Sequence, residues 1–352
     1  MGPAEKRIPS PDVSIRSSVN SSFHLCGHDG ARPAIGPVFH MRLRAGYTTG
    51  MEEKYLSVLE HCELCPKECG VNRLTGERGF CTCGADCVIA HYGPHFGEEP
   101  PISGTRGSGT VFFSPCNLRC LFCQNHQISQ RTSGEKVSIA QLADIFIDLE
   151  RRGCHNINLV SPTPYAPQIA SAIGRAREAG VAIPFLYNTN AYENRATIRM
   201  LDGLIDIYLP DLKYAGSAVA SLLSAAPGYP ERAMEAVTEM KSQVGDLVVE
   251  RGVAKRGLLI RHLVLPGGLA GTRRLIAWIK KALGSETALS LMSQYYPAYR
   301  ADAYRLINRR IRSDEYDPLV TLMREEGFGN VFIQELESAH SYQPDFTKKK
   351  PF

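Results

Sequence analysis

Three cysteines in one short segment are the residues of this sequence best suited to chemistry. Residues 116–123 read Cys-Asn-Leu-Arg-Cys-Leu-Phe-Cys, so Cys116, Cys120 and Cys123 have the spacing C-x3-C-x2-C. A cluster of four irons and four sulfides has four irons to ligate, and three thiolates leave one iron open to another molecule. The spacing therefore predicts a reactive iron–sulfur site. A zinc site closed by His126 as the fourth ligand is the alternative.

A second group of cysteines lies upstream of this segment. The group can close a zinc site or hold a second iron–sulfur cluster, and both alternatives stay open. Cys83 and Cys87 are alternates for the fourth ligand. The chain has 11 cysteines, and most fall within residues 62–123, which pairs of disulfides explain poorly and metal ligation in a reducing compartment explains better. The ligands that we expect are Cys62, Cys65, Cys69 and Cys81.

The composition is that of an ordinary soluble protein. Hydrophobic residues make up 43% of the chain and charged residues 22%, and the formal net charge is +4. No run approaches the length of a membrane span, and the N-terminal residues lack a secretory apolar region, so we expect a cytoplasmic protein without membrane contacts. We find no convincing surface of interleaved basic and aromatic residues, which argues against a nucleic-acid partner.

Short apolar runs alternate with helical patterns from residue 110 onward. The apolar period predicts helices at 138–152 and 168–179, the first capped by Ser138. Alternating strands and helices imply a parallel sheet with right-handed crossovers, and six such units predict an α/β fold, a partial and opened (β/α)6 barrel. The predicted strands are 110–114, 156–160, 183–188, 204–209, 257–265 and 287–292, with a last one at 330–334.

The same patterns divide the chain into four parts. Residues 1–45 are rich in Ser, Pro, Gly and Arg and are expected to form a flexible extension. A cysteine-rich module is expected at 46–105, the barrel domain at 106–340, and a C-terminal tail at 341–352. The module is too short to bury much core without a metal to staple it.

Polar residues follow the predicted strands at the end where barrels of this kind carry their chemistry. Asn188 ends the third strand, Asp211 and Lys213 follow the fourth, and Arg261 and His262 lie on the fifth. We predict that these side chains gather around the three-cysteine loop and bind a cofactor there.

The three-cysteine spacing, with the aromatic Phe122 before the last cysteine, resembles the signature of the radical S-adenosylmethionine (SAM) enzymes. The resemblance implies that the open iron binds the amino and carboxylate groups of SAM. It also implies reductive cleavage of SAM to a 5′-deoxyadenosyl radical, which abstracts a hydrogen atom from a substrate. Phe122 would then pack near the adenine or shield the cluster, and Asn125 would form a hydrogen bond near the cluster.

Two further segments resemble the pyruvate formate-lyase activating enzymes, a branch of that family. They are Asp211-Leu-Lys213 and residues 260–267, Ile-Arg-His-Leu-Val-Leu-Pro-Gly. The resemblance implies that Asp211 and Lys213 lie beside SAM and that Arg261 and His262 line the active site. One departure is the turn Ser-Pro-Thr-Pro at 161–164, where many radical SAM proteins have a Gly-Gly-Glu-Pro-like turn.

The function that follows is a radical SAM enzyme acting on an unknown substrate. The related subgroup's name suggests a protein substrate, activated at a glycine to form a glycyl radical. A reducing partner such as flavodoxin or ferredoxin would supply the electron. The alternatives are radical modification of another peptide, an RNA base or a metabolite, and, in a different class, a non-catalytic zinc or iron–sulfur binding module.

Overall fold

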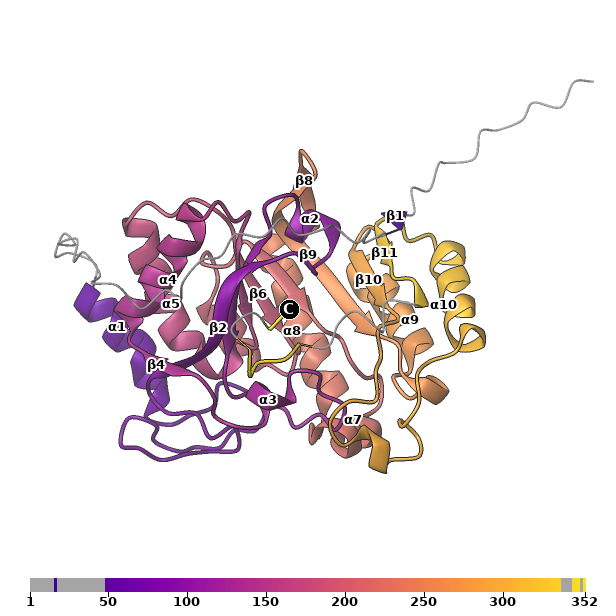
Figure 1. Cartoon of the computed structure of the whole chain (residues 1–352), viewed down its shortest axis with the longest axis horizontal. Helices are drawn as coiled ribbons and strands as arrows, with labels where there is room; N and C mark the ends of the chain where they lie inside the picture. Colours follow the sequence, from indigo (N-terminus) through magenta and orange to yellow (C-terminus); the bar gives the residue numbers. More distant parts are fainter. Residues whose placement is uncertain (1–15, 18–47, 337–343, 349–350) are drawn as a thin grey trace, which may run out of the picture.

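A mostly parallel sheet forms the centre of the computed structural model, which describes residues 16–17, 48–336, 344–348 and 351–352 (Figure 1). Along the sheet the parallel neighbours run in the order β1, β11, β10, β9, β7, β6, β5 and β3. The predicted α/β fold with a mostly parallel sheet is therefore confirmed. These strands are β1 (Arg16–Ser17), β3 (Ser108–Phe113), β5 (Ile157–Val160), β6 (Phe185–Thr189), β7 (Ile207–Pro210), β9 (Val253–Leu263), β10 (Ala288–Met292) and β11 (Val331–Ile333).

An antiparallel margin that the sequence did not predict extends the sheet beyond β3. Strand β2 (Cys87–His95) pairs with β3, and β4 (Glu135–Val137) pairs with β2. Gly93 and Pro94 interrupt the apolar pattern of β2, which hides it from a search for period-two alternation. A second hairpin joins β8 (Val248–Glu250) to the start of β9, so β9 begins earlier than the predicted strand at 257.

The helices cover the sheet as expected for crossover connections (Figure 1). Helix α4 begins at the predicted cap: the Ser138 hydroxyl accepts from the N–H of Gln141, and the Gln141 side chain accepts in return from Ser138 N–H. The other helices are α1 (Thr48–Leu56), α2 (Pro100–Ser103), α3 (His126–Ser129), α4 (Ile139–Arg151), α5 (Ala166–Glu178), α6 (Arg195–Met200), α7 (Ser217–Ser224), α8 (Tyr229–Val244), α9 (Thr272–Leu283) and α10 (Ser313–Glu325), with short 3-10 turns η1 (Ser57–Leu59), η2 (Thr163–Tyr165), η3 (Pro266–Gly268) and η4 (Ala301–Ala303).

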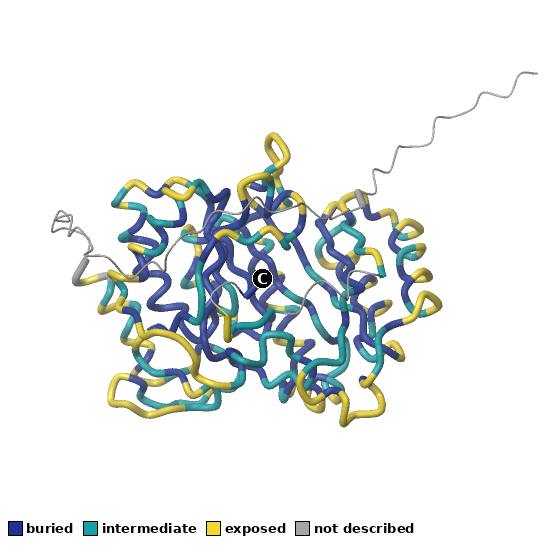
Figure 2. The backbone as a smooth tube through the Cα atoms, viewed as in Figure 1, coloured by how far each residue is buried: buried dark blue, intermediate teal, exposed yellow. Residues whose placement is uncertain are grey.

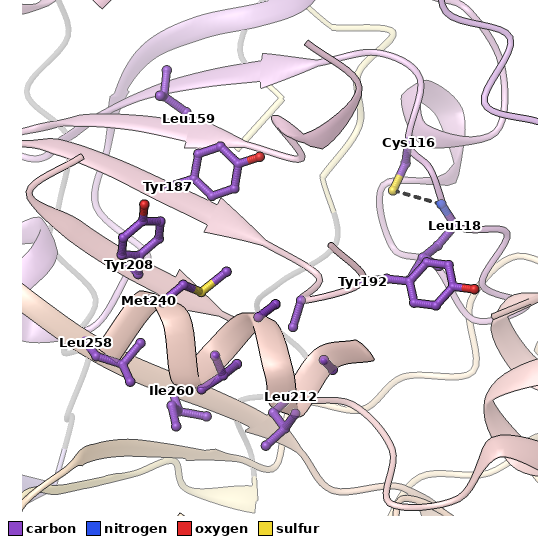
Figure 3. Packing of buried hydrophobic residues seen from close by; sticks show 14 of the residues in the cluster. Cys116, Leu118, Leu159, Tyr187, Tyr192, Tyr208, Leu212, Met240, Leu258 and Ile260 are labelled. Carbon is purple, nitrogen blue, oxygen red and sulfur yellow. Dashed lines mark hydrogen bonds between the residues drawn. The ribbon is translucent and has the colours of Figure 1, made fainter. Parts of the chain in front are cut away.

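The two faces of the sheet have different partners. Side chains on the outer face, among them Tyr187, Tyr208 and Leu258, belong to the main core and point toward the helix that carries Met240 (Figure 3). Side chains on the inner face form a smaller cluster that includes Ile102 of α2. The burial pattern follows these layers, with buried residues concentrated in the strands and the adjoining helix faces (Figure 2). Consecutive side chains of one strand therefore pack on opposite faces of the sheet, one in the main core and the next in the smaller inner cluster.

The described part of the C-terminal tail lies against the inner face beside β2 and β3. The ring of Phe352 is 5.2 Å from that of Phe112 and 4.4 Å from that of His95. Phe346 packs on Phe112 at 5.4 Å, and its N–H donates to the Gln127 side chain at 2.7 Å. In Figure 1 the C-terminus accordingly lies over the middle of the sheet.

The predicted extension at 1–45 lies outside the described residues, apart from β1. The boundaries expected at residues 46, 106 and 341 stay predictions. Among the residues that are described, no helix combines the length and apolar character needed to cross a membrane.

Candidate functional site

The three-cysteine loop follows β3 at the edge where the parallel strands end. Main-chain hydrogen bonds fix its path against two neighbouring segments. The N–H of Cys116 donates to the carbonyl of Ser129 in α3 at 3.1 Å, and the N–H of Leu121 donates to the carbonyl of Leu223 in α7 at 2.8 Å. The thiols are therefore presented by a loop that the surrounding protein holds in place.

The Cys116 sulfur is buried and receives two N–H groups. The backbone N–H of Leu118 donates to it at 3.4 Å, as Figure 3 shows. The side-chain amide of Asn190 donates to the same sulfur at 3.4 Å and to the Asn117 carbonyl oxygen at 2.7 Å. Asn190 follows β6, so a second strand end contributes to this position. Donors aimed at a sulfur favour the thiolate over the thiol.

Hydroxyl groups contact the other two thiols of the loop. The Ser224 hydroxyl donates to the Cys120 sulfur at 3.0 Å, and the Tyr214 hydroxyl lies 2.6 Å from Ser224 Oγ. The Cys123 sulfur lies 3.1 Å from the Ser129 hydroxyl. Each sulfur of the loop thus has a donor of its own, from a different part of the chain.

Burial dominates the protonation of these thiols. It raises the pKa of Cys116 and Cys120, and the Lys213 ammonium opposes the shift at both. It also raises the pKa of Cys123 to about 12, against hydrogen bonds from the Ser129 hydroxyl and the Asn125 backbone N–H. Metal ligation must therefore displace protons from all three sulfurs. Asn125 acts here through its main chain.

The side chains around the loop do not form a single-ion site as they stand in the described residues. Across the described residues, no three His, Cys, Asp or Glu side chains converge on one point as ligands of a single ion do. The His126 ring stacks on Tyr299 at 4.9 Å, and its Nδ1 lies 3.2 Å from the Cys123 carbonyl oxygen. His126 is thus turned away from closing a zinc site with the three cysteines.

Asp211 and Lys213 form a close, partly buried ion pair beside the loop. The Lys213 ammonium is 2.7 Å from an Asp211 carboxylate oxygen. Burial alone would lower the pKa of Lys213, but the charges of Asp211 and Cys120 raise it above its ordinary value. The Tyr229 hydroxyl accepts from the Lys213 N–H at 2.9 Å and fixes this turn. The ion pair is therefore held in position by the turn that carries it.

Phe122 lies next to that ion pair. Its ring is buried and meets Tyr295 edge to face at 5.5 Å. Phe122, Lys213, Leu263 and Leu265 line one small cavity. An apolar ring and an ammonium group therefore face a common space at the side of the cysteine loop.

Asn188, Asp211 and Arg261 share the inner face of the sheet. Asn188 pairs with Val160 in the ladder between β5 and β6, and Asp211 forms a bridge with Arg261. The guanidinium of Arg261 is already engaged: its Nε donates to Glu99 at 2.8 Å, and its Nη2 donates to both Glu98 and Glu99. Burial opposes its charge, but Glu99 and Glu98 raise the pKa of Arg261 well above its ordinary value.

His262 is not brought together with the other predicted residues. It pairs in register with Leu291, which packs in the outer core. Its Nδ1 lies 2.6 Å from the Leu212 carbonyl oxygen, its Nε2 lies 2.8 Å from the Thr272 hydroxyl, and burial lowers its pKa to about 4. Both ring nitrogens are used within the core, because residues 261 and 262 point to opposite faces of β9.

A buried carboxyl group near the second strand end escaped the sequence analysis. Glu193 accepts from the hydroxyls of Thr163 at 2.6 Å and Thr189 at 2.5 Å. Burial raises its pKa to about 7, against these hydrogen bonds, and its Oε2 has no partner among the described residues. Thr163 belongs to the turn that departs from the Gly-Gly-Glu-Pro pattern. An acid therefore does contact that turn, but it comes from the loop after β6.

The upstream cysteines lie between η1 and β2. Burial raises the pKa of Cys65 to about 12, and the nearby Cys81 and Cys62 thiols add to the rise. A hydrogen bond from Cys83 lowers the pKa of Cys81 to about 6. Cys83 and Cys87 are both buried in the main core, as is Cys154.

Comparison with known proteins identifies one part of the chain. Residues 110–267 match the model of the Radical SAM superfamily. An uncharacterized protein of Methanocaldococcus jannaschii, MJ0674, is 29% identical over 277 residues, which cover 76% of this chain and 75% of that protein. A second uncharacterized protein of that organism, MJ0808, is 24% identical over 261 residues, covering 68% and 71%.

Solved structures that match part of this chain include a crystal structure of HydG, a maturase of the FeFe-hydrogenase, with a TM-score of 0.45 and 12% identity, covering 62% of this chain and 49% of that one. HydG of Carboxydothermus hydrogenoformans gives 0.43 and 15%, covering 62% and 56%. This chain thus spans about half the length of those structures. The residues that match the model of the radical SAM superfamily, 110–267, include the three-cysteine loop and strands β5 to β9, so this part of the chain is similar to that superfamily.

Proposed function

We propose that this chain is a radical SAM enzyme whose three-cysteine loop holds a four-iron, four-sulfide cluster. The observation that carries the proposal is the set of separate donors on the three sulfurs: Asn190 and the Leu118 N–H on Cys116, and hydroxyls on the other two. Hydrogen bonds to the sulfurs stabilise thiolate ligands and tune the reduction potential of a cluster.

When bound, the cluster with SAM on its open iron supplies one-electron cleavage of a carbon–sulfur bond, which yields a 5′-deoxyadenosyl radical able to take a hydrogen atom from a substrate. Cys116, Cys120 and Cys123 hold three irons in this proposal. The Asp211–Lys213 pair presents fixed charges at the side of the loop, and Phe122 keeps water from the cavity that it shares with Lys213. The polar groups of SAM are bound at this charge pair.

Arg261 has a positioning role in this proposal. Its two carboxylate partners leave the guanidinium little capacity for a ligand, and they tie the segment before α2 to the inner face. His262 is left out of the cofactor site because its ring belongs to the outer core.

The substrate that we propose is a polypeptide, as for an activating enzyme that acts on a glycine of a partner protein. The support is the inner face itself, which accommodates the chain's own tail through Phe346 and Phe352. A small acidic electron-transfer protein, flavodoxin or ferredoxin, is the proposed source of electrons. Incubation with dithionite, unlabelled SAM and peptides deuterated at the glycine α-carbon tests this substrate class. Deuterium recovered in 5′-deoxyadenosine supports it, and transfer only from deuterated nucleosides or metabolites contradicts it.

The test of the radical activity compares two cysteine variants. Cys120→Ala removes one proposed iron ligand, whereas Cys154→Ala removes a core thiol away from the loop. After anaerobic reconstitution and reduction, Cys154→Ala should form 5′-deoxyadenosine from SAM at the wild-type rate, and Cys120→Ala should form none. Retention of nucleoside formation in Cys120→Ala would refute the assignment of the loop.

A further inference from the structure

The upstream cysteines lie in a segment that has little else to hold it. Residues 60–86 contain neither helix nor strand, far beyond the roughly 12–15 residues of an ordinary irregular connection. Within this segment only Leu64, Arg73 and Cys83 are buried. So few buried side chains supply little hydrophobic stabilisation, and a fixed path then requires a cross-link such as a metal centre.

The four predicted ligands are neighbours within this segment. Cys62 and Cys81 both lie near enough to Cys65 to interact with it. Two backbone hydrogen bonds fold the chain back on itself, from Cys62 N–H to the carbonyl of Val71 and from Gly70 N–H to the carbonyl of Cys62. Cys62, Cys65 and Cys81 are thus close together although their sequence positions span residues 62–81.

Cys69 is held toward the same region by close packing. The N–H of Phe80 donates to its sulfur at 3.3 Å. A Cβ atom on Gly79 would come within 2.7 Å of that sulfur, so only glycine fits there without displacing it. The segment 79–81 can therefore approach Cys69 only because residue 79 is a glycine, which has no side chain.

Arg73 provides the strongest indication of negative charge. It is 2% exposed, and its donors reach the carbonyls of Gly84 and Pro164 and the sulfur of Cys62. No carboxylate among the described residues pairs with it, and the charges nearest to it are those of cysteines. A buried guanidinium without an anion is costly, and its Nη1 lies 3.8 Å from the Cys62 sulfur, so metal ligation by that sulfur would place a compensating negative charge beside it.

The segment also packs directly on the three-cysteine loop. Arg119 links the two: its Nη2 donates to the carbonyl of Phe80 at 2.8 Å and its Nη1 to that of Cys116 at 2.9 Å. The Cys83 thiol donates to the Pro115 carbonyl at 3.8 Å. A centre held by this segment therefore lies beside the first cluster site.

We propose that Cys62, Cys65, Cys69 and Cys81 hold a second iron–sulfur cluster, with Arg73 as its buried counter-cation. The segment packs on the three-cysteine loop through Arg119 and Cys83, so a centre held there is placed to exchange electrons with the first cluster, which iron–sulfur chemistry allows and zinc does not. The Phe80 N–H donates to the Cys69 sulfur, and the Arg73 guanidinium donates to the Cys62 sulfur. These donors would stabilise the thiolate ligands of the second cluster, as the donors in the three-cysteine loop would for the first. The proposal goes beyond SAM cleavage, which requires only the first loop.

The test separates the two sites by removing the first. A Cys116→Ala, Cys120→Ala, Cys123→Ala triple variant, purified anaerobically and reconstituted, should keep about four irons and four sulfides per chain and give the electron paramagnetic resonance (EPR) signal of a reduced cluster. Adding Cys65→Ala and Cys81→Ala should remove that iron, while adding Cys154→Ala should not. Zinc without sulfide in the triple variant, or no metal at all, would overturn the proposal.

Failure of this proposal and failure of the proposed function give different results. A wild-type protein with about four irons, all lost in the triple variant, refutes the second cluster and leaves the radical site intact. The same four irons kept in full by the triple variant refute the first loop as a ligand and leave the second cluster. Arg73 has its own readout in the triple variant: Arg73→Met should lower the cluster's midpoint potential, and Arg73→Lys should restore it. Equal midpoint potentials in the Arg73→Met and Arg73→Lys variants would contradict the role of Arg73 as counter-cation.

Discussion

Replacing Arg261 by methionine should destabilise the protein strongly, because it leaves two buried carboxylates without a cation. The Arg261 side chain is 12% exposed and those of Glu98 and Glu99 are 8% exposed. At the observed 2.8 Å between Arg261 Nε and Glu99 Oε1, one contact is worth about 6 kcal/mol of attraction at an effective dielectric constant of about 20. Desolvation of the guanidinium offsets part of this.

Removal of one member of such a buried pair costs about 3–5 kcal/mol. With a denaturant slope of about 3 kcal/mol per M, the urea midpoint of Arg261→Met should fall by roughly 1 M or more at pH 7. Arg261 lowers the pKa of Glu99, so its stabilisation is present above the unfolded-state pKa of that carboxyl group and lost as the pH falls through the folded-state value. The deficit of the variant should therefore shrink at acid pH.

The assay is urea unfolding followed by circular dichroism at pH 7 and at about pH 3, because the pKa of Glu99 in the folded protein lies below its ordinary value. Lys280→Met is the matched control, since Lys280 pairs with Glu326 at the surface and its loss should change the midpoint little. The triple variant Glu98→Gln, Glu99→Gln, Arg261→Met should recover much of the lost stability. A loss below about 1 kcal/mol, or one that does not depend on pH, would refute the account of Arg261 as a structural cation.

Three further results follow from buried groups. Glu193→Gln should stabilise the protein increasingly as the pH rises from about 4.5 to 7, by up to about 3 kcal/mol. The reason is that burial raises the pKa of Glu193 to about 7, so ionisation of its carboxyl group opposes folding. Equal urea midpoints of the variant and the wild-type protein at pH 8 would contradict this. Ser224→Ala removes the hydroxyl on Cys120 and should lower the midpoint potential of the first cluster in an EPR-monitored titration, an unchanged potential being the adverse result. Deleting residues 344–352 should raise the pKa of His95, because burial lowers that pKa in the full chain and Phe352 packs on the His95 ring. If the pKa of His95, measured by NMR, is the same in the truncated and full-length proteins, the tail does not cover this residue.

The architecture could be predicted because its signals are local. The apolar runs and the Ser138 cap specify α4 and the parallel strands β3, β5, β6, β7, β9 and β10 within a few residues. Strand β2 was missed because Gly93 and Pro94 break its alternation, and its pairing with β3 is antiparallel, outside the repeat that the rest of the chain follows.

The site was predictable only where chemistry is concentrated in sequence. The spacing of Cys116, Cys120 and Cys123 identifies the loop, and Asp211 with Lys213 forms the expected neighbouring pair. Successive side chains of a strand point to opposite faces of the sheet, so Arg261 and His262 could already have been predicted to lie on different faces.

Other residues carry no local signal. The donors Asn190 and Ser224 reach the sulfurs through the fold, from segments 70 and more residues away in sequence. Glu193 lies beside Thr163 for the same reason, although the two positions are 30 apart in sequence. Polar side chains of these types are common at turns, so only the three-dimensional arrangement distinguishes them.

The central claim is that the loop at residues 116–123 supports reductive cleavage of SAM. The most direct measurement is formation of 5′-deoxyadenosine by the anaerobically reconstituted protein with dithionite and SAM, alongside its iron, sulfide and zinc content. The account predicts a brown protein that forms the nucleoside and loses this activity with Cys120→Ala. A zinc-containing protein that forms no nucleoside after full reconstitution would contradict it.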